Sequence, residues 1–227
     1  MSTTYIGTQK SHVINNNSFV SIKTNQYNYS PLVKGSIAPV FNLLTQQVLT
    51  KYHIYGSLAN EQVINLQDFL DYGKPLVIVF YSTSINTKPP VAELESLQAD
   101  VDVMGGKLLV ITNSHINAFR RALKQQEYSL TVYHDANNLL AEEFGLYDEL
   151  NPLWHWVSGV ENESMSLPAV YVVAPDREIV YRHVNYSLEL FSGNSFANHF
   201  SVREMLTAVY QNSQKNIYNR LGKRIVS

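Results

Sequence analysis

The sequence predicts an α/β fold in which a central mixed β-sheet is flanked by helices. Three apolar runs rich in Val, Ile and Leu alternate with segments whose apolar residues have helical spacing, which is typical of parallel strands joined by helical crossovers. Two further apolar runs flank a short turn, which predicts a hairpin and so makes the sheet mixed. The five predicted strands are residues 76–81, 108–112, 130–133, 169–173 and 178–182.

The first crossover shows the pattern most clearly. Residues 76–81 form a continuous apolar run, which suits a strand buried on both faces. Pro89 and Pro90 follow, and proline is well tolerated in the first turn of a helix. Apolar residues then recur at Val91, Leu94, Leu97 and Val101, before two consecutive glycines. We therefore expect one helix here, with an apolar face turned toward the sheet.

Weaker signals give the remaining elements. Asp135 is placed to cap a helix over residues 139–144 that stops at Gly145, and residues 202–210 predict a closing amphipathic helix. The stretch 147–166 is too long for a structureless connection, so we expect it to be partly helical. Shorter patterns predict a strand near residues 40–43, another near 63–66 and a helix over 66–72.

Composition divides the chain and limits its partners. Residues 1–34 are polar and predict an N-terminal arm, residues 35–212 predict the folded domain, and residues 213–227 form a basic C-terminal tail. The net charge is −2, so no general electrostatic attraction to nucleic acid or to anionic membranes is expected. The chain shows no secretory signal pattern and no membrane-spanning apolar run, and a cytoplasmic protein is expected.

Several segments together resemble one known family. They occur in a specific order and spacing, and are residues 35–41, 73–81, 93–97, 135–146, 167–173 and 179–181. In these the chain resembles the peroxiredoxin-like alkyl hydroperoxide reductase and thiol-specific antioxidant family (AhpC/TSA, or redoxin) of the thioredoxin superfamily. The resemblance implies a thioredoxin-like fold and an antioxidant oxidoreductase ancestry.

The family's reactive cysteines are missing. In such proteins a cysteine lies between the first buried strand and the following helix, often paired as Cys-x-x-Cys. Counting back from Glu93 puts the two positions at Thr87 and Pro90, whereas counting forward from Phe80 puts them at Asn86 and Pro89. None of the four is cysteine, and the whole chain of 227 residues contains no cysteine.

This substitution removes the usual chemistry. A helix N-terminus carries about half a positive charge and stabilises a thiolate there. A threonine hydroxyl such as that of Thr87 has no comparable acidity, and no neighbouring base is evident. Tyr81 and Lys88 are candidate residues of the remaining pocket, and the resemblance implies that Pro168 is a cis-proline facing the same site.

No other constellation in the sequence predicts catalysis. The seven histidines show no metal-ligand spacing, so we expect no metal and no cofactor. The chain is best interpreted as a redox-inactive peroxiredoxin-like protein that binds or scaffolds an unknown protein or small ligand. Two alternatives stay open, namely an enzyme with non-thiol chemistry at the same cleft and an antioxidant role completed by a partner. A homodimer is compatible with each of them.

Overall fold

The computed structural model describes most of the predicted domain. The described residues are 29–44, 47–49, 63–70, 73–82, 90–113, 116–126, 129–155, 165–186 and 200–225. The strands are β1 (Asn42–Leu44), β2 (Val48–Leu49), β3 (Val63–Asn65), β4 (Leu76–Phe80), β5 (Lys107–Thr112), β6 (Val132–His134), β7 (Ala169–Val173) and β8 (Ile179–Val184). The α-helices are α1 (Leu66–Leu70), α2 (Val91–Val103), α3 (Ile116–Gln126), α4 (Leu139–Glu143) and α5 (Val202–Ile225), and a 3₁₀ helix, η3, spans Leu153–His155.

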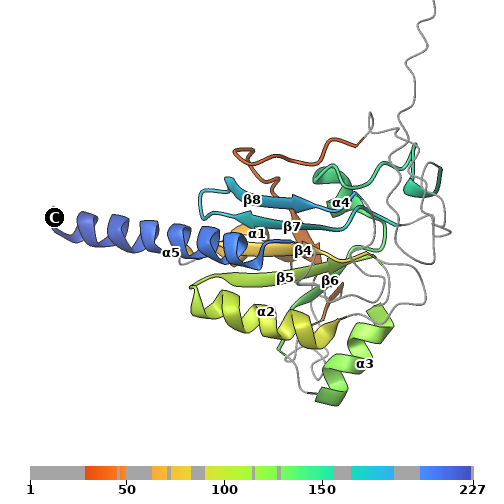
Figure 1. Ribbon diagram of the computed structural model, residues 1–227, viewed down its shortest axis with the longest axis horizontal. Helices are drawn as coiled ribbons and strands as arrows, with labels where there is room; N and C mark the ends of the chain where they lie inside the picture. The colour runs from red at the N-terminus through yellow and green to blue at the C-terminus, as the bar shows by residue number, and fades with distance from the viewer. Residues whose placement is uncertain are drawn as a thin grey trace, which may run out of the picture.

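Six strands form one mixed sheet in the order β2-β6-β5-β4-β7-β8 (Figure 1). The three central strands β4, β5 and β6 are parallel, as their helical crossovers predict. The hairpin β7–β8 adds on antiparallel beside β4, and β2 adds on antiparallel beside β6. The predicted mixed sheet is thus confirmed, although no pattern in the sequence predicts the two-residue strand β2.

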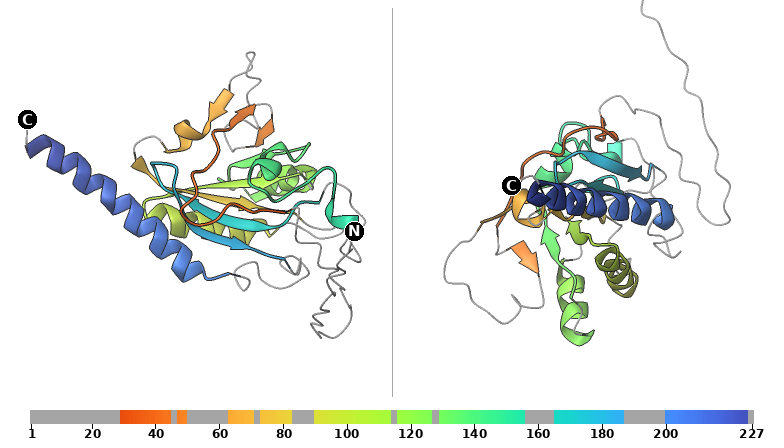
Figure 2. Two further views of the ribbon diagram at one scale, coloured as in Figure 1. Left: turned by 90° about the horizontal axis from the view of Figure 1, so that it is seen from above. Right: turned by 90° about the vertical axis from the view of Figure 1, so that its left-hand side faces the viewer.

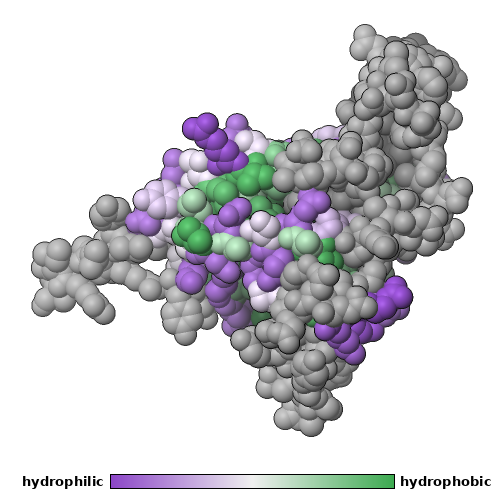
Figure 3. Space-filling model, turned by 60° about the horizontal axis from the view of Figure 1, so that its bottom comes forward, coloured by the Kyte–Doolittle hydropathy of each residue, from purple (hydrophilic) through white to green (hydrophobic). Residues whose placement is uncertain are grey.

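The sheet is buried on both faces. Successive side chains of β4 alternate between two apolar cores, so Leu76, Ile78 and Phe80 belong to one and Val77 and Val79 to the other. The first core lies against α1 and α4, and the second against α2, α3 and α5. This two-sided burial explains the continuous apolar run of β4 in the sequence. Figure 3 turns the bottom of Figure 1 toward the viewer. On this outer face hydrophobic residues lie between hydrophilic ones.

The closing helix is longer than the sequence predicts. α5 has 24 residues and extends past the body of the domain, so the basic tail continues a helix instead of forming a separate segment (Figure 2). Its first turns pack closely on the end of α2. A Cβ at Gly106 would lie 2.7 Å from Val209 of α5 and 3.0 Å from Val101 of α2, so a residue without a side chain is required for this approach.

Only the end of the predicted N-terminal arm is described, and it packs on the domain. Tyr29 is buried, and the backbone N–H of Leu32 donates a hydrogen bond to the carbonyl of Phe144 at 3.1 Å. The boundary at residue 34 stays a prediction, since residues 1–28 lie outside the described part of the chain. None of the helices in the described ranges combines the length and apolar character that a bilayer crossing needs.

Candidate functional site

Polar residues follow each of the three parallel strands where it ends. Ser82 comes two residues after β4, Asn113 directly follows β5, and Asp135 directly follows β6. Parallel strands end at the same edge of a sheet, and open α/β sheets bind their ligands outside this carboxyl edge. The carboxyl edge of β4, β5 and β6 is therefore the candidate functional site.

The segment that leads into β7 lies against the end of β4. Phe80 pairs with Ala169 in antiparallel register, which brings Pro168 beside the chain as it leaves β4. The backbone N–H of Ser166 donates to the Ser82 hydroxyl at 3.2 Å, which joins the two segments directly. The predicted site thus combines residues that are far apart in sequence, since Ser82 and Ser166 are separated by 84 positions.

The predicted cysteine positions are only partly described. Asn86, Thr87, Lys88 and Pro89 lie outside the described residues, and their place in the site stays a prediction. Pro90 is described and precedes α2, where its carbonyl accepts the first helical hydrogen bond, from Leu94 N–H at 3.0 Å.

The predicted cis peptide bond at Pro168 is wrong. The described residues contain no cis peptide bond, so the Leu167–Pro168 bond is trans. Trans is the lower-energy isomer of an X–Pro bond by about 0.5–1 kcal/mol. The extended chain also satisfies the Pro168 carbonyl, which accepts a hydrogen bond from Asn185 N–H at 2.9 Å as β7 begins.

A partly buried chain of hydrogen bonds links the ends of β4 and β5 to the loop between β6 and α4. The Ser82 hydroxyl donates to Asn113 Oδ1 at 3.4 Å, and Asn113 Nδ2 donates to Asn138 Oδ1 at 2.6 Å. Ser82 is 1% exposed and Asn138 is 2% exposed. Polar groups removed from water need such partners, so the network fixes the geometry of the loops around the edge.

Asp135 stabilises the loop that carries Asn138. Its Oδ2 accepts hydrogen bonds from the backbone N–H groups of Leu140 and Ala141, both at 3.0 Å, which caps α4 as the sequence predicts. Burial raises the pKa of the Asp135 carboxyl, and the hydrogen bonds from the Ala141 and Leu140 N–H groups act in the opposite direction. Asn138 adopts a left-handed backbone conformation with φ of 57°, which asparagine tolerates better than most residues.

Tyr81 lies in the core on the α2 side of the sheet. Its ring is 1% exposed and packs edge-on against Phe119 of α3, with ring centroids 5.6 Å apart. Its backbone N–H donates to the Ile111 carbonyl at 2.7 Å. This burial fits a structural role for the ring, while its predicted part in a pocket with Lys88 stays a prediction because Lys88 is not described.

The described residues at this edge offer hydroxyl and amide hydrogen-bonding groups and one carboxylate that caps a helix. The chain supplies no thiol for the edge, because it contains no cysteine. Sequence reasoning missed Ser82, Asn113 and Asn138. Ser82 and Asn113 could have been predicted, because each is a polar residue that follows a buried strand where the chain turns away from the core.

Comparisons with known proteins agree with this architecture. Residues 35–182 match the model of the AhpC/TSA family. A Haemophilus influenzae protein named "Putative peroxiredoxin bcp" is 26% identical over 150 residues, which cover 63% of this chain and 87% of that protein.

Solved structures show the same fold at low sequence identity. AhpC of Mycobacterium tuberculosis is 14% identical with a TM-score of 0.54, and the match covers 79% of this chain and 92% of that one. The reduced 2-Cys peroxiredoxin of Plasmodium vivax is 15% identical with a TM-score of 0.54, covering 85% and 86%. The solved structures thus show a thioredoxin-like fold, in agreement with the sheet order described above. The match over residues 35–182 shows that the chain belongs to the AhpC/TSA family, although it contains no cysteine.

Proposed function

We propose that this chain is a binding module of the AhpC/TSA family that does not reduce peroxides by thiol chemistry. The observation that carries the proposal is the complete absence of cysteine from a chain that keeps the family's fold. Peroxide reduction by thiols begins with attack by a thiolate, and neither threonine nor asparagine supplies an equivalent nucleophile near neutral pH.

The carboxyl edge of β4, β5 and β6 is the proposed binding surface. Its support is the partly buried network of Ser82, Asn113 and Asn138, which ties the ends of β4 and β5 to the loop before α4. A rigid scaffold beneath surface segments is the usual arrangement for recognition sites in α/β proteins. Pro90, at the start of α2, and Pro168, at the start of β7, border this surface.

Peroxide turnover tests the absence of thiol chemistry. The full chain is incubated at high concentration with hydrogen peroxide or an alkyl hydroperoxide and with dithiothreitol or a thioredoxin system. We expect no consumption above that of buffer. Steady consumption that survives metal chelation would contradict the proposal and favour non-thiol catalysis at the cleft. Consumption that requires one added redox protein would favour a role completed by a partner.

Site-specific photocrosslinking tests the location of binding. A photoreactive residue at position 90 lies at the amino end of α2, and the same residue at position 103 lies at the carboxyl end of the same helix, where Val103 is 82% exposed. We expect partner adducts from position 90 and few or none from position 103. Equal adducts at both positions would show that the carboxyl edge of the sheet is not the binding surface.

Two further properties belong to the proposal. We propose a homodimer, which light scattering coupled to size exclusion tests by the molar mass in solution. We also propose a cytoplasmic location, which fractionation of cells expressing the tagged chain tests.

A further inference from the structure

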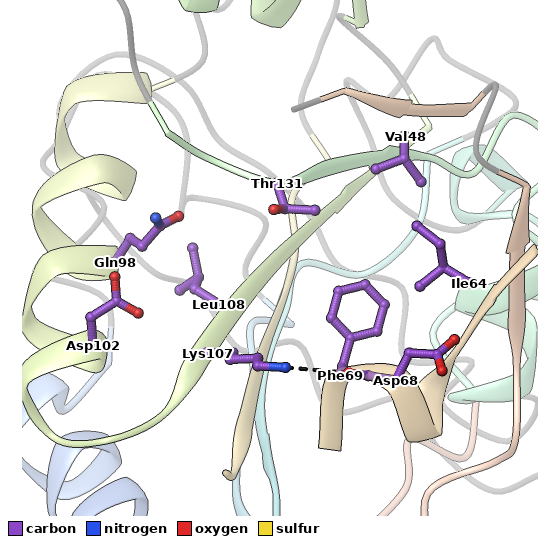
Figure 4. Close-up of a pocket in the computed structure, with 9 residues that line it drawn as sticks. All are labelled: Val48, Ile64, Asp68, Phe69, Gln98, Asp102, Lys107, Leu108 and Thr131. Carbon is purple, nitrogen blue, oxygen red and sulfur yellow. Dashed lines mark hydrogen bonds between the residues drawn. The ribbon is translucent and has the colours of Figure 1, made fainter. Parts of the chain in front are cut away.

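A hollow lies at the edge of the sheet opposite the carboxyl edge. A cavity of about 320 Å³ opens where β5 begins and where the chain enters β6, at the amino ends of these strands (Figure 4). It is lined by Val48, Ile64, Asp68, Phe69, Gln98, Asp102, Lys107, Leu108 and Thr131. Its size is equivalent to about ten water molecules and lies at the small end of the range for ligand pockets.

The walls of the cavity are largely apolar. Val48 and Leu108 are buried, and Ile64 and Phe69 are partly buried against the neighbouring core. These four side chains come from β2, β5, β3 and α1, so elements distant in sequence converge on one space. Ile64 and Phe69 stay partly exposed, and this apolar surface in a concave site favours a ligand with a hydrocarbon part, because each buried CH₂ group contributes about 0.8 kcal/mol.

Two of the charged residues at the mouth already have partners. The Asp68 carboxylate accepts a hydrogen bond from Asn65 N–H at 2.7 Å and so belongs to the cap of α1. Lys107 Nζ donates to the Asp68 carbonyl at 3.2 Å, and in Figure 4 its side chain extends toward α1.

Asp102 differs from them. Among the described residues, its carboxylate receives no hydrogen bond. It lies on the exposed side of α2 near Gln98, which also lines the cavity (Figure 4). Burial raises the pKa of this carboxyl, while Lys74 lowers it and Glu95 raises it. The carboxylate therefore has capacity for a hydrogen-bonding cation. Of the charged residues that line the cavity, Asp68 and Asp102 are acidic and Lys107 is basic.

We propose that this cavity binds a small organic cation, in which a short hydrocarbon lies among Val48, Phe69 and Leu108 and an ammonium group contacts Asp102. The Gln98 amide and the Thr131 hydroxyl line the same space and offer further oxygen acceptors for ammonium hydrogens. This site is separate from the carboxyl edge, where the proposed function is located.

Three hexyl compounds of matched length test the proposal on the unmodified full chain. n-Hexylammonium, n-hexanol and hexanoate are titrated separately, and amide chemical shifts are followed by two-dimensional NMR. We expect shifts centred on Leu108, Thr131 and Phe69, with affinity falling in the order hexylammonium, hexanol, hexanoate. The absence of shifts at these residues would overturn the cavity as a site. Equal affinities or the reverse order would overturn its preference for a cation.

Two variants on one helix separate the contact from general charge. Asp102→Asn is expected to weaken hexylammonium binding about two- to fivefold at low ionic strength, as befits a contact at an exposed mouth. Asp100→Asn removes an equal charge from an exposed position of α2 that does not line the cavity, and is expected to leave the affinity unchanged. Equal effects of the two substitutions would overturn the Asp102 contact. If Asp102→Asn does not fold, the three-compound comparison on the unmodified chain decides the question alone.

Discussion

The two edges of the central sheet use their polar groups in different ways. At the carboxyl edge, the half-buried Asn113 bonds to both Ser82 and Asn138, which are themselves removed from solvent. At the amino edge, charged residues surround the mouth of an apolar cavity, and the Asp102 carboxylate receives no hydrogen bond from the described residues. At the carboxyl edge the polar side chains thus hold the loops of the fold. At the amino edge Asp68 and Lys107 also bond within the fold, and Asp102 is the residue that we propose for a ligand.

The largest loss of stability is expected at the carboxyl edge, from the substitution Asp135→Ala. The substitution leaves the N–H groups of Leu140 and Ala141 without their acceptor in a buried site, and should lower the free energy of unfolding by about 2–3 kcal/mol in urea denaturation. Asp148→Ala is the matched control, because Asp148 accepts one N–H, from Leu150, in an exposed turn. Its expected cost is below about 1 kcal/mol. Similar losses for both would show that burial does not strengthen the carboxyl-edge network.

The next largest effect on stability is expected from the hydrogen bond between Asn113 and Asn138, and a double-mutant cycle measures it. Asn113→Ala and Asn138→Ala each remove one partner of the 2.6 Å hydrogen bond, and each should cost about 1–2 kcal/mol of stability. Since both side chains belong to one buried network, we expect a coupling of about 1 kcal/mol between them. Strictly additive losses would show that the two side chains stabilise the fold independently.

The smallest effect on stability is expected at the amino edge, and its size depends on pH. A raised pKa means that folding favours the neutral form of Asp102, so its ionised form opposes folding at neutral pH. Asp102→Asn should therefore increase stability at pH 7 by a few tenths of a kcal/mol, because the side chain is exposed and screened. The gain should shrink as the pH falls through the raised pKa and vanish below 3.8, where the residue is neutral in both states.

Denaturation of Asp102→Asn and Asp100→Asn, at pH 7 and again below pH 3.8, checks whether Asp102→Asn gains stability at neutral pH. A loss of stability in Asp102→Asn at pH 7 would show that attraction to Lys74 outweighs the effect of burial. The amino edge would then resemble the carboxyl edge in using its charges for the fold.

Most of the central fold could be predicted because its signals are local. The buried run of β4, the helical spacing of α2 and the Asp135 cap each follow from a few consecutive residues, and the structure bears them out. The strand β2 was missed because two residues carry no periodicity. Its pairing with β6 depends on tertiary contact instead.

The site was harder to predict than the fold. The Ser82–Asn113–Asn138 network joins loops that are far apart in sequence, and single polar residues in loops carry no mark of burial. The amino-edge cavity is built from β2, β3, α1, α2 and β5, so no local pattern could reveal it. The cis form expected at Pro168 came from family resemblance, and the strand geometry of this chain accommodates the trans form.

In this chain a peroxiredoxin fold persists without a reactive thiol. A single-turnover measurement can test this, by mixing the full chain with one equivalent of hydrogen peroxide and no reductant. A peroxidatic thiol is oxidised by its substrate within such a mixture, whereas methionine oxidation is the only sulfur chemistry this sequence permits. We expect peroxide to persist as in buffer over the first minute, with the intact mass of the chain unchanged. Rapid loss of close to one equivalent of peroxide would contradict the account.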